Sequence, residues 1–187
     1  MEVAQKRKWM SNRVTNNIQI QGNEGSRTFF DKLCRRFSQR PEDKLSQIPA
    51  VLWKNSHDGT ISWSYKHMKC RWAVVEKTGM DYIIVLSGKM PASGMQERIF
   101  KTIKKIDPKV VIINEYEDTE HKYIGTRILY CDYDIEEKVS EEEIKNIDTD
   151  GDVCYNTILE MKKAARYRAE GRLSELTVIE EGDYNDD

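Results

Sequence analysis

Hydrophobic and polar side chains alternate from Val14 to Gln21, the pattern of a strand that buries one face. After Gly25-Ser26 the period changes, and apolar residues recur at i, i+3, i+4 and i+7: Phe30, Leu33, Cys34 and Phe37. That spacing predicts a helix whose apolar stripe packs on a sheet. The chain is therefore expected to open with a strand followed by a helix.

The middle of the chain predicts a hairpin, a second helix and two more strands. β-branched residues crowd segments 73–77 and 81–87, and Gly79 lies in the short turn between them. Pro91 and Ser93 suit a helix start, and Asp107-Pro108 ends the helical spacing of Met95, Ile99, Ile103 and Ile106. Segments 110–113 and 122–131 are predicted to be strands.

The predicted fold class is α+β, with a ferredoxin-like antiparallel sheet of order βαββαβ plus an extra strand. Both helices are expected on one face of the sheet. The expected core consists of helix residues that pack on strand residues: Phe30, Leu33, Phe37, Ile99 and Ile103 against Ile18, Ile20, Val85 and Ile112.

Beyond residue 132 the sequence becomes acidic and predicts a helical hairpin. Ser140 can cap a helix whose third position is Glu143, which completes a capping box. A second helix is expected where Cys154, Ile158, Met161 and Ala165 share one face. The expected segments are a basic arm (1–8), a ferredoxin-like domain (9–132), an acidic helical appendage (133–171) and a disordered acidic tail (172–187).

Several short segments, in the same order along the chain, are similar to those of a known family. They are Trp9 with Asn12, Lys69-Cys70-Arg71-Trp72 before Ala73-Val74-Val75, Met90-Pro91-Ala92, and Asn114-Glu115-Tyr116-Glu117 with Gly125. The chain thereby resembles the YubB-like family of plasmid and phage proteins of unknown function. The resemblance implies a ferredoxin-like domain and a phage or plasmid origin.

Charge is balanced overall but unevenly distributed. The chain has 30 Lys and Arg against 32 Asp and Glu. Residues 1–40 carry nine bases and three acids, whereas residues 134–152 carry nine acids and two bases. No apolar run reaches the roughly 20 residues of a membrane-spanning helix, and no apolar stretch follows Lys6-Arg7-Lys8 as in a signal peptide. A cytoplasmic location is expected.

No metal or other cofactor is predicted. The four cysteines are far apart and form no Cys-x-x-Cys pair, so reduced thiols are expected rather than a zinc site or disulfides. The segment from Asn146 to Asp152 has the oxygen spacing of a calcium loop. Its twelfth position is Thr157 where a bidentate glutamate should close the site, so we predict a turn that caps the next helix.

The basic residues near the start of the chain suggest one possible function. Phosphates attract such clusters, and a neighbouring Trp can stack on an unpaired base. The candidate residues are Lys6, Arg7, Lys8, Trp9, Arg13, Arg35 and Arg36. Against a single-stranded nucleic-acid or RNA-binding module, segment 81–86 lacks the aromatic pattern of an RNA-binding strand. Nucleic-acid binding is therefore the alternative hypothesis.

A dense aromatic and basic cluster supports the first hypothesis, which is protein binding. It comprises Trp53, Trp63, Tyr65, Lys66, His67, Lys69 and Arg71, with Trp72 expected in the core. Trp, Tyr and Arg dominate protein interfaces, and the acidic Glu141, Glu142 and Glu143 could meet a basic site. Because no catalytic motif is present, we expect a non-enzymatic phage or mobile-element protein that modulates or inhibits a host or defence-system protein.

Overall fold

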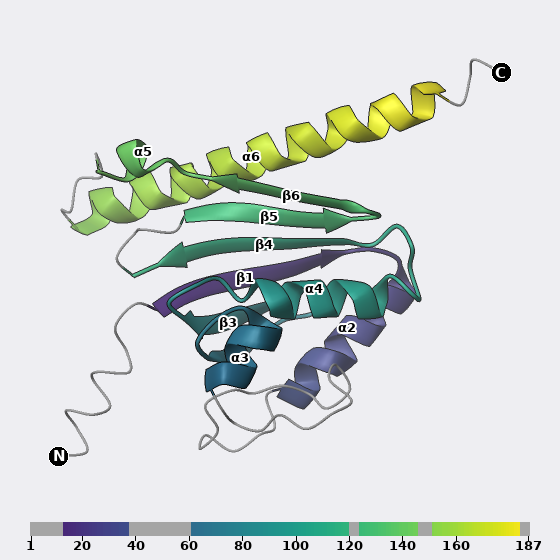
Figure 1. Ribbon diagram of the computed structural model, residues 1–187, viewed down its shortest axis with the longest axis horizontal. Helices are drawn as coiled ribbons and strands as arrows, with labels where there is room; N and C mark the ends of the chain where they lie inside the picture. The colour runs from purple at the N-terminus through teal and green to yellow at the C-terminus, as the bar shows by residue number, and fades with distance from the viewer. Residues whose placement is uncertain (1–12, 38–60, 120–123, 146–150, 184–187) are drawn as a thin grey trace.

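The computed structural model describes residues 13–37, 61–119, 124–145 and 151–183. It contains a six-stranded sheet of order β2-β3-β1-β4-β5-β6 in which every neighbouring pair is antiparallel (Figure 1). The α+β class is therefore confirmed. The strands are β1 (Arg13–Gln21), β2 (Ala73–Thr78), β3 (Tyr82–Gly88), β4 (Val111–Asp118), β5 (Ile124–Tyr130) and β6 (Tyr133–Lys138). The helices are α2 (Glu24–Phe37), α3 (Ile61–Met68), α4 (Ser93–Ile103), α5 (Glu141–Lys145) and α6 (Gly151–Asp183).

One face of the sheet is covered by a layer formed by α2, α3 and α4, and this interface is the main core. The predicted helix residues Phe30, Leu33, Ile99 and Ile103 are buried in it. They share one cluster with the predicted strand residues: Ile18, Ile20, Val85 and Ile112. The side chain of Phe37 lies outside the described part of the chain. The predicted core is confirmed for the other residues.

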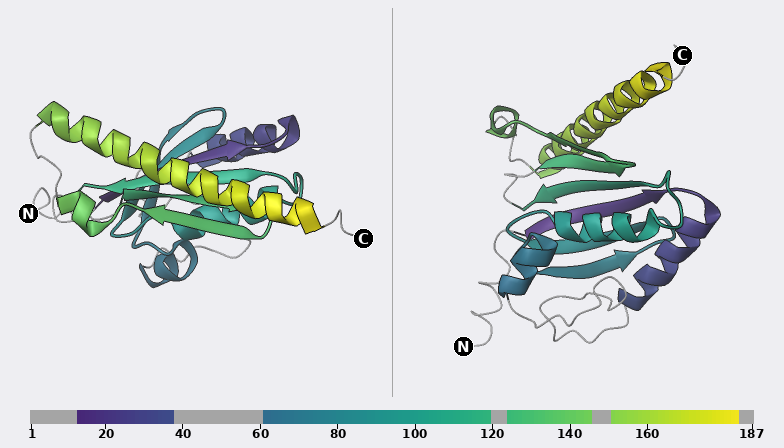
Figure 2. Two further views of the ribbon diagram at one scale, coloured as in Figure 1. Left: turned by 90° about the horizontal axis from the view of Figure 1, so that it is seen from above. Right: turned by 45° about the vertical axis from the view of Figure 1, so that its right-hand side comes forward.

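The opposite face of the sheet is covered over β4, β5 and β6 by the long helix α6 (Figure 2). Ile113, Ile128, Ile135 and Ala169 form one cluster on this side. Successive strand residues point to opposite faces, so Ile112 contributes to the main core whereas its neighbour Ile113 packs under α6. β4 and β5 are thus largely buried on both faces, whereas the residues of β6 that face away from α6 are exposed.

The structure differs from the sequence-based expectation after residue 132. The segment expected to begin a helical appendage forms β6, which pairs with β5 across the short turn at residues 131–132. Tyr133 and Ile135 face α6 while Asp134 and Glu136 face the other way. This is the alternation of a strand, and the high acidic content of the region obscured it. The expected domain boundary at residue 132 therefore falls inside the sheet.

The second C-terminal helix is also longer than expected. It was predicted to stop near Gly171, with a disordered tail from residue 172, but α6 continues to Asp183. Leu173 and Leu176 follow Gly171 and pack against the cluster of Ile113, Ile128, Ile135 and Ala169. Burial of these leucines stabilises the additional turns of α6. The capping box at the start of α5 is confirmed: the Glu143 amide donates to Ser140 Oγ, and the Ser140 amide donates to Glu143 Oε2.

Truncating Phe30, whose side chain is fully buried in the main core, tests the packing of α2 on the sheet. Phe30→Ala is expected to lower the free energy of unfolding by about 3 to 5 kcal/mol, because it leaves a cavity. Tyr167→Ala, at an 80% exposed position on α6, is the control and should change stability by less than about 0.5 kcal/mol. Urea denaturation of the three proteins measures both effects. Similar values for the two variants would contradict the assigned core.

Candidate functional site

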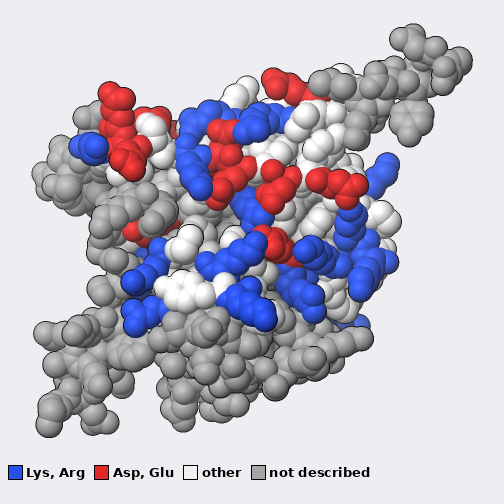
Figure 3. Space-filling model, in the orientation of Figure 1, with Lys and Arg blue, Asp and Glu red and all other residues white. Residues whose placement is uncertain are grey.

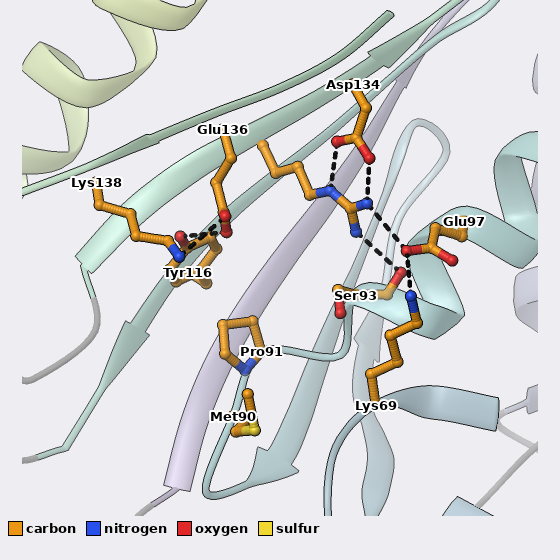
Figure 4. A pocket seen from close by; sticks show the side chains of 10 residues that line it. Lys69, Met90, Pro91, Ser93, Glu97, Tyr116, Asp134, Glu136 and Lys138 are labelled. Carbon is orange, nitrogen blue, oxygen red and sulfur yellow. Dashed lines mark hydrogen bonds and ion pairs between the residues drawn. The ribbon is translucent and has the colours of Figure 1, made fainter. Parts of the chain in front are cut away.

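A charged pocket of about 430 Å³ lies beside α4, over the half of the sheet formed by β4, β5 and β6 (Figure 4). Its lining comes from five regions: the turn after α3, the β3–α4 connection with the first turns of α4, and strands β4, β5 and β6. Two hydrogen-bonded groups line the pocket, one centred on Arg127 and one on Glu136. Figure 4 shows Asp134 and Glu97 on one side and Glu136, Tyr116 and Lys138 on the other. We refer to this cavity as the charged pocket.

Arg127 on β5 is the centre of the first group. Its Nε donates to Asp134 on β6 at 2.7 Å, and its Nη2 donates both to Asp134 and to Glu97 on α4, the latter at 2.9 Å. Lys69 donates to the same Glu97 oxygen at 3.2 Å. Only 11% of the Arg127 side chain is exposed. A nearly buried guanidinium is thus held by two carboxylates from different elements.

These contacts fix the charge state of the first group. The hydrogen bond from Arg127 lowers the pKa of Asp134. Burial alone would raise the pKa of Glu97, but hydrogen bonds from Arg127 and Lys69 outweigh it, so this pKa is also lowered. The pKa of Arg127 is raised because its bonds to Asp134 and Glu97 outweigh the effect of burial. All three side chains are therefore ionised at neutral pH.

The second group joins Tyr116, Glu136 and Lys138. Tyr116 is 1% exposed, and its Oη donates to Glu136 Oε1 at 2.7 Å. Lys138 Nζ lies 3.0 Å from the other oxygen of Glu136. Burial, reinforced by the bond to Glu136, raises the pKa of Tyr116. The phenol thus stays protonated and acts as a hydrogen-bond donor.

Gly125 allows Tyr116 to reach Glu136 across the sheet. Gly125 is the β5 partner of Tyr116 on β4, so the tyrosine ring lies over the glycine. A Cβ at position 125 would lie 2.7 Å from Tyr116 Oη, and also 2.7 Å from the backbone oxygen of Glu137. A residue with a side chain would therefore displace the ring or β6.

Close packing of α3 on α4 positions Lys69. A Cβ at Gly94 would collide with the backbone of His67 and Met68, so this glycine lets the end of α3 touch the first turn of α4. Lys69, in the turn that follows α3, then lies within reach of Glu97, one turn further along α4. The glycine thus brings a lysine from a distant part of the sequence into the pocket.

Buried amides fix α4 to the sheet. Asn16 on β1 is fully buried, and its Oδ1 accepts the Ala92 amide hydrogen at 2.8 Å, just before the helix. Gln96, also fully buried, donates to the backbone oxygen of Arg127 at 2.9 Å. Helix α4 therefore contacts Arg127 twice. Gln96 is hydrogen-bonded to its backbone oxygen, and Glu97 pairs with its side chain.

Left-handed backbone conformations occur in the turns that build the pocket. Among the described residues, the non-glycine residues with positive φ are Lys69 (60°), Lys89 (68°) and Cys131 (48°). Lys69 lines the pocket, and Lys89 directly precedes the lining residues Met90 and Pro91. Cys131 lies in the turn that leads to Asp134. Such conformations cost energy in residues with a Cβ, and they often accompany functional sites.

The structure places part of the predicted aromatic and basic cluster on the surface. Tyr65 is 42% exposed, Lys66 and Lys69 are exposed, and His67 and Arg71 are half-buried. Trp53 lies outside the described residues, as does the side chain of Trp63. Trp72 is half-buried against Gly88 rather than fully in the core. Of this cluster, Lys69 belongs to the charged pocket.

The other predicted site residues are not brought to this surface. Glu141, Glu142 and Glu143 are exposed on α5, which follows the edge strand β6, whereas α3 lies toward the other edge of the sheet (Figure 1). Their role in partner binding stays a prediction. Arg13 is half-buried at the start of β1. The remaining basic candidates lie outside the described residues or have side chains that do: Lys6, Arg7, Lys8, Trp9, Arg35 and Arg36.

Metal ligands and thiols add no second site to the described part of the chain. No three His, Cys, Asp or Glu side chains among the described residues lie close enough to hold a metal ion. Residues 146–150 of the calcium-like loop are outside the described residues, and Thr157 lies within α6. Cys70 and Cys131 are reduced thiols, and Cys70 is buried. None of the described helices combines the length and apolar character needed to cross a bilayer.

Most residues of the charged pocket were missed from the sequence: Glu97, Tyr116, Arg127, Asp134, Glu136 and Lys138. One signal was available, because Asp134, Glu136 and Lys138 alternate with Tyr133, Ile135 and Glu137. Taken as a strand, that pattern places three charged side chains on one face.

Comparison with protein-family models, with curated proteins and with solved structures finds no match. The resemblance to the YubB-like family therefore stays a prediction.

Asp134 should make stability depend on pH. Its folded-state pKa is lower than its unfolded value, about 3.9. Its stabilisation is therefore present above that value and is lost as pH falls through the folded pKa. Asp134→Asn should be less stable than the wild type at pH 7, and the difference should shrink below about pH 3.5.

Asp132→Asn is the matched control for this experiment. Asp132 is 99% exposed and is paired with Lys104, so its substitution should have little effect at either pH. Urea denaturation at both pH values measures the differences. A pH-independent deficit in Asp134→Asn would show that Arg127 does not depend on the charge of Asp134.

Gly125→Ala tests whether the glycine makes room for Tyr116. The new methyl group should lower stability by about 1 to 3 kcal/mol through overpacking. Tyr116→Ala removes the ring, whose Oη and Cζ the methyl would meet at 2.7 and 2.9 Å. The double variant should therefore lose less stability than the two single losses combined, which a double-mutant cycle measures. If the two stability losses simply add, Gly125 makes room for the backbone of β6 and not for Tyr116.

Proposed function

We propose that this chain is a non-enzymatic accessory protein, encoded by a phage or another mobile element, that binds a host or defence-system protein. Its binding surface is the outer side of α3 and α4, together with the rim of the charged pocket. Binding modulates or inhibits the partner by covering part of its surface. The mobile-element origin rests on the family resemblance.

The proposal is carried by the separation of charge in the folded protein. In the helix layer, the described segments 24–33, 65–71 and 89–109 hold eleven Lys and Arg against four Asp and Glu. In strands β4, β5 and β6 together with α5 and α6, the described segments 111–118, 124–145 and 155–178 hold eight bases against thirteen acids. Figure 3 shows Lys and Arg gathered over the lower part of the helix-covered face. The helix layer therefore attracts an acidic surface.

The outer side of α4 concentrates this charge. Arg98 and Lys101 are exposed one turn apart on α4, and the exposed Lys105 lies in the turn that follows the end of the helix at Ile103. Tyr65 and Lys66 lie on α3, which packs against α4. An exposed tyrosine and exposed cations on neighbouring helices combine an anchor with electrostatic steering.

The fold class supports a binding surface on the helix side of the sheet. The order β2-β3-β1-β4, with α2 and α4 on one face, supports a ferredoxin-like core. Strands β5 and β6 extend that core at one edge, and α6 covers their second face. The helix side of the core then remains as the broad surface for a partner.

Two exposed tyrosines allow a matched test of this surface. Tagged wild-type protein, Tyr65→Ala and Tyr167→Ala are used to capture partners from host lysate, with and without nuclease treatment. Tyr65 lies on α3, and Tyr167 is 80% exposed on α6. A nuclease-resistant partner should bind Tyr65→Ala roughly tenfold more weakly, mainly through faster dissociation, and should bind Tyr167→Ala normally. Equal binding to both variants would place the interface elsewhere.

Single-stranded nucleic acid is the second candidate partner. The row of exposed bases on α4 and the turn after it (Arg98, Lys101 and Lys105) is the observation that favours it. Phosphates would bind this row through counterion release, so affinity should fall steeply with salt. Changing both Lys101 and Lys105 to Ala should reduce the slope of log affinity against log salt by about 1 to 2. Lys162 and Lys163 on α6, changed to Ala, are the control. A gel-shift salt titration decides the matter, and no shift at low salt would remove this alternative.

A further inference from the structure

We propose that the charged pocket binds a small organic anion, with a carboxylate or phosphate group next to an apolar part. The pocket volume of about 430 Å³ falls in the range of small-molecule sites. This inference is independent of the protein partner proposed above, because it concerns a cavity that can fill without any macromolecule.

The hydrogen-bonding capacity of the lining favours an anion. Both oxygens of Asp134 accept from Arg127, and both oxygens of Glu136 are engaged by Tyr116 and Lys138. An incoming cation would have to compete with these donors for the same oxygens. Glu97 accepts from both Arg127 and Lys69 through its Oε1, so each of the three pocket carboxylates already pairs with a cation of the protein.

The amines retain donors for a ligand. Lys69 and Lys138 are each joined to one carboxylate by the contacts described above, and an ammonium group has three N–H donors. Their side chains are 54% and 61% exposed, so both amines lie at the rim. Arg127 Nη1 has only a long contact of 3.4 Å, to the backbone oxygen of Ser93. A carboxylate or phosphate can therefore accept bonds that the protein leaves open.

Charges around the pocket determine the sign of the electrostatic potential at its mouth. The ionised lining is balanced, with three cations and three anions, so neighbouring charges decide the potential at the mouth. Two exposed bases of the helix layer, Lys89 and Arg98, directly adjoin the lining residues Met90 and Glu97 in the sequence. Such exposed bases raise the local concentration of anions.

The remaining lining explains why the anion should be organic. Met90, which is 46% exposed, and the half-buried Pro91 form an apolar wall (Figure 4). A bare inorganic ion would leave this wall in contact with water, whereas a ligand with a hydrocarbon group would cover it. Lys89, whose φ is 68°, directly precedes Met90 and sets the backbone direction at the start of this wall.

The test uses four simple probes on the full-length protein: benzoate, phenyl phosphate, inorganic phosphate and benzylammonium. Binding is followed by calorimetry and by the amide shifts of pocket residues in two-dimensional NMR. Benzoate or phenyl phosphate should bind at millimolar concentration or below and shift pocket amides. Inorganic phosphate should bind more weakly than phenyl phosphate, and benzylammonium should not bind. The two organic anions distinguish a carboxylate site from a phosphate site.

Variants then locate the site. Changing Lys69 and Lys138 together to Met should weaken binding of the preferred anion by at least about tenfold, since charge-assisted hydrogen bonds are lost. Lys163→Met, on α6 outside the pocket, should bind within about twofold of the wild type. Tighter binding of benzylammonium than of benzoate, no binding of either organic anion, or unchanged binding in the double variant would each overturn the proposal. Because no lysate partner is involved, these outcomes do not depend on the capture experiment.

Discussion

Arg127 projects from a strand that is buried almost throughout, and its charge must be neutralised inside the protein. Burying a guanidinium without partners would cost several kcal/mol. The partners come from the next strand and from a helix: Asp134 on β6 and Glu97 on α4. One buried charge therefore ties the edge of the sheet and the helix layer to β5. The same requirement creates the pocket, because the carboxylates that satisfy Arg127 also fix Lys69 at its rim.

The second face of the sheet uses charge in a different way. Glu115 and Glu117 on β4 point toward α6, where they are paired with Arg166 and Lys162. Glu137 on β6 is likewise engaged by Arg172. The bases of α6 are thus matched by acids on the strands beneath them. The helix layer on the opposite face has fewer acids among its described residues, so its basic surplus remains available to a partner.

Local patterns in the sequence predicted the elements whose neighbours in space are also neighbours in sequence. The Phe30 stripe, the hairpin of β2 and β3, and the capping box at Ser140 are of this kind. β6 was not predicted because its acidic side chains mask the alternation of Tyr133 and Ile135 with Asp134 and Glu136. The pocket could not be predicted, since it depends on strand register: Gly125 must lie opposite Tyr116, and Arg127 must lie two pairs further along, opposite Asn114. No local pattern specifies that pairing.

Lys69 links the two proposals, because it belongs to the exposed cluster after α3 and also to the rim of the charged pocket. An anion bound at that rim would reduce the positive charge presented by the helix layer. If both proposals hold, a pocket anion and an acidic partner compete for the same electrostatic attraction. Thermodynamic linkage then requires each to weaken the other by the same factor. The size of that factor would report how far the partner's surface extends over the pocket.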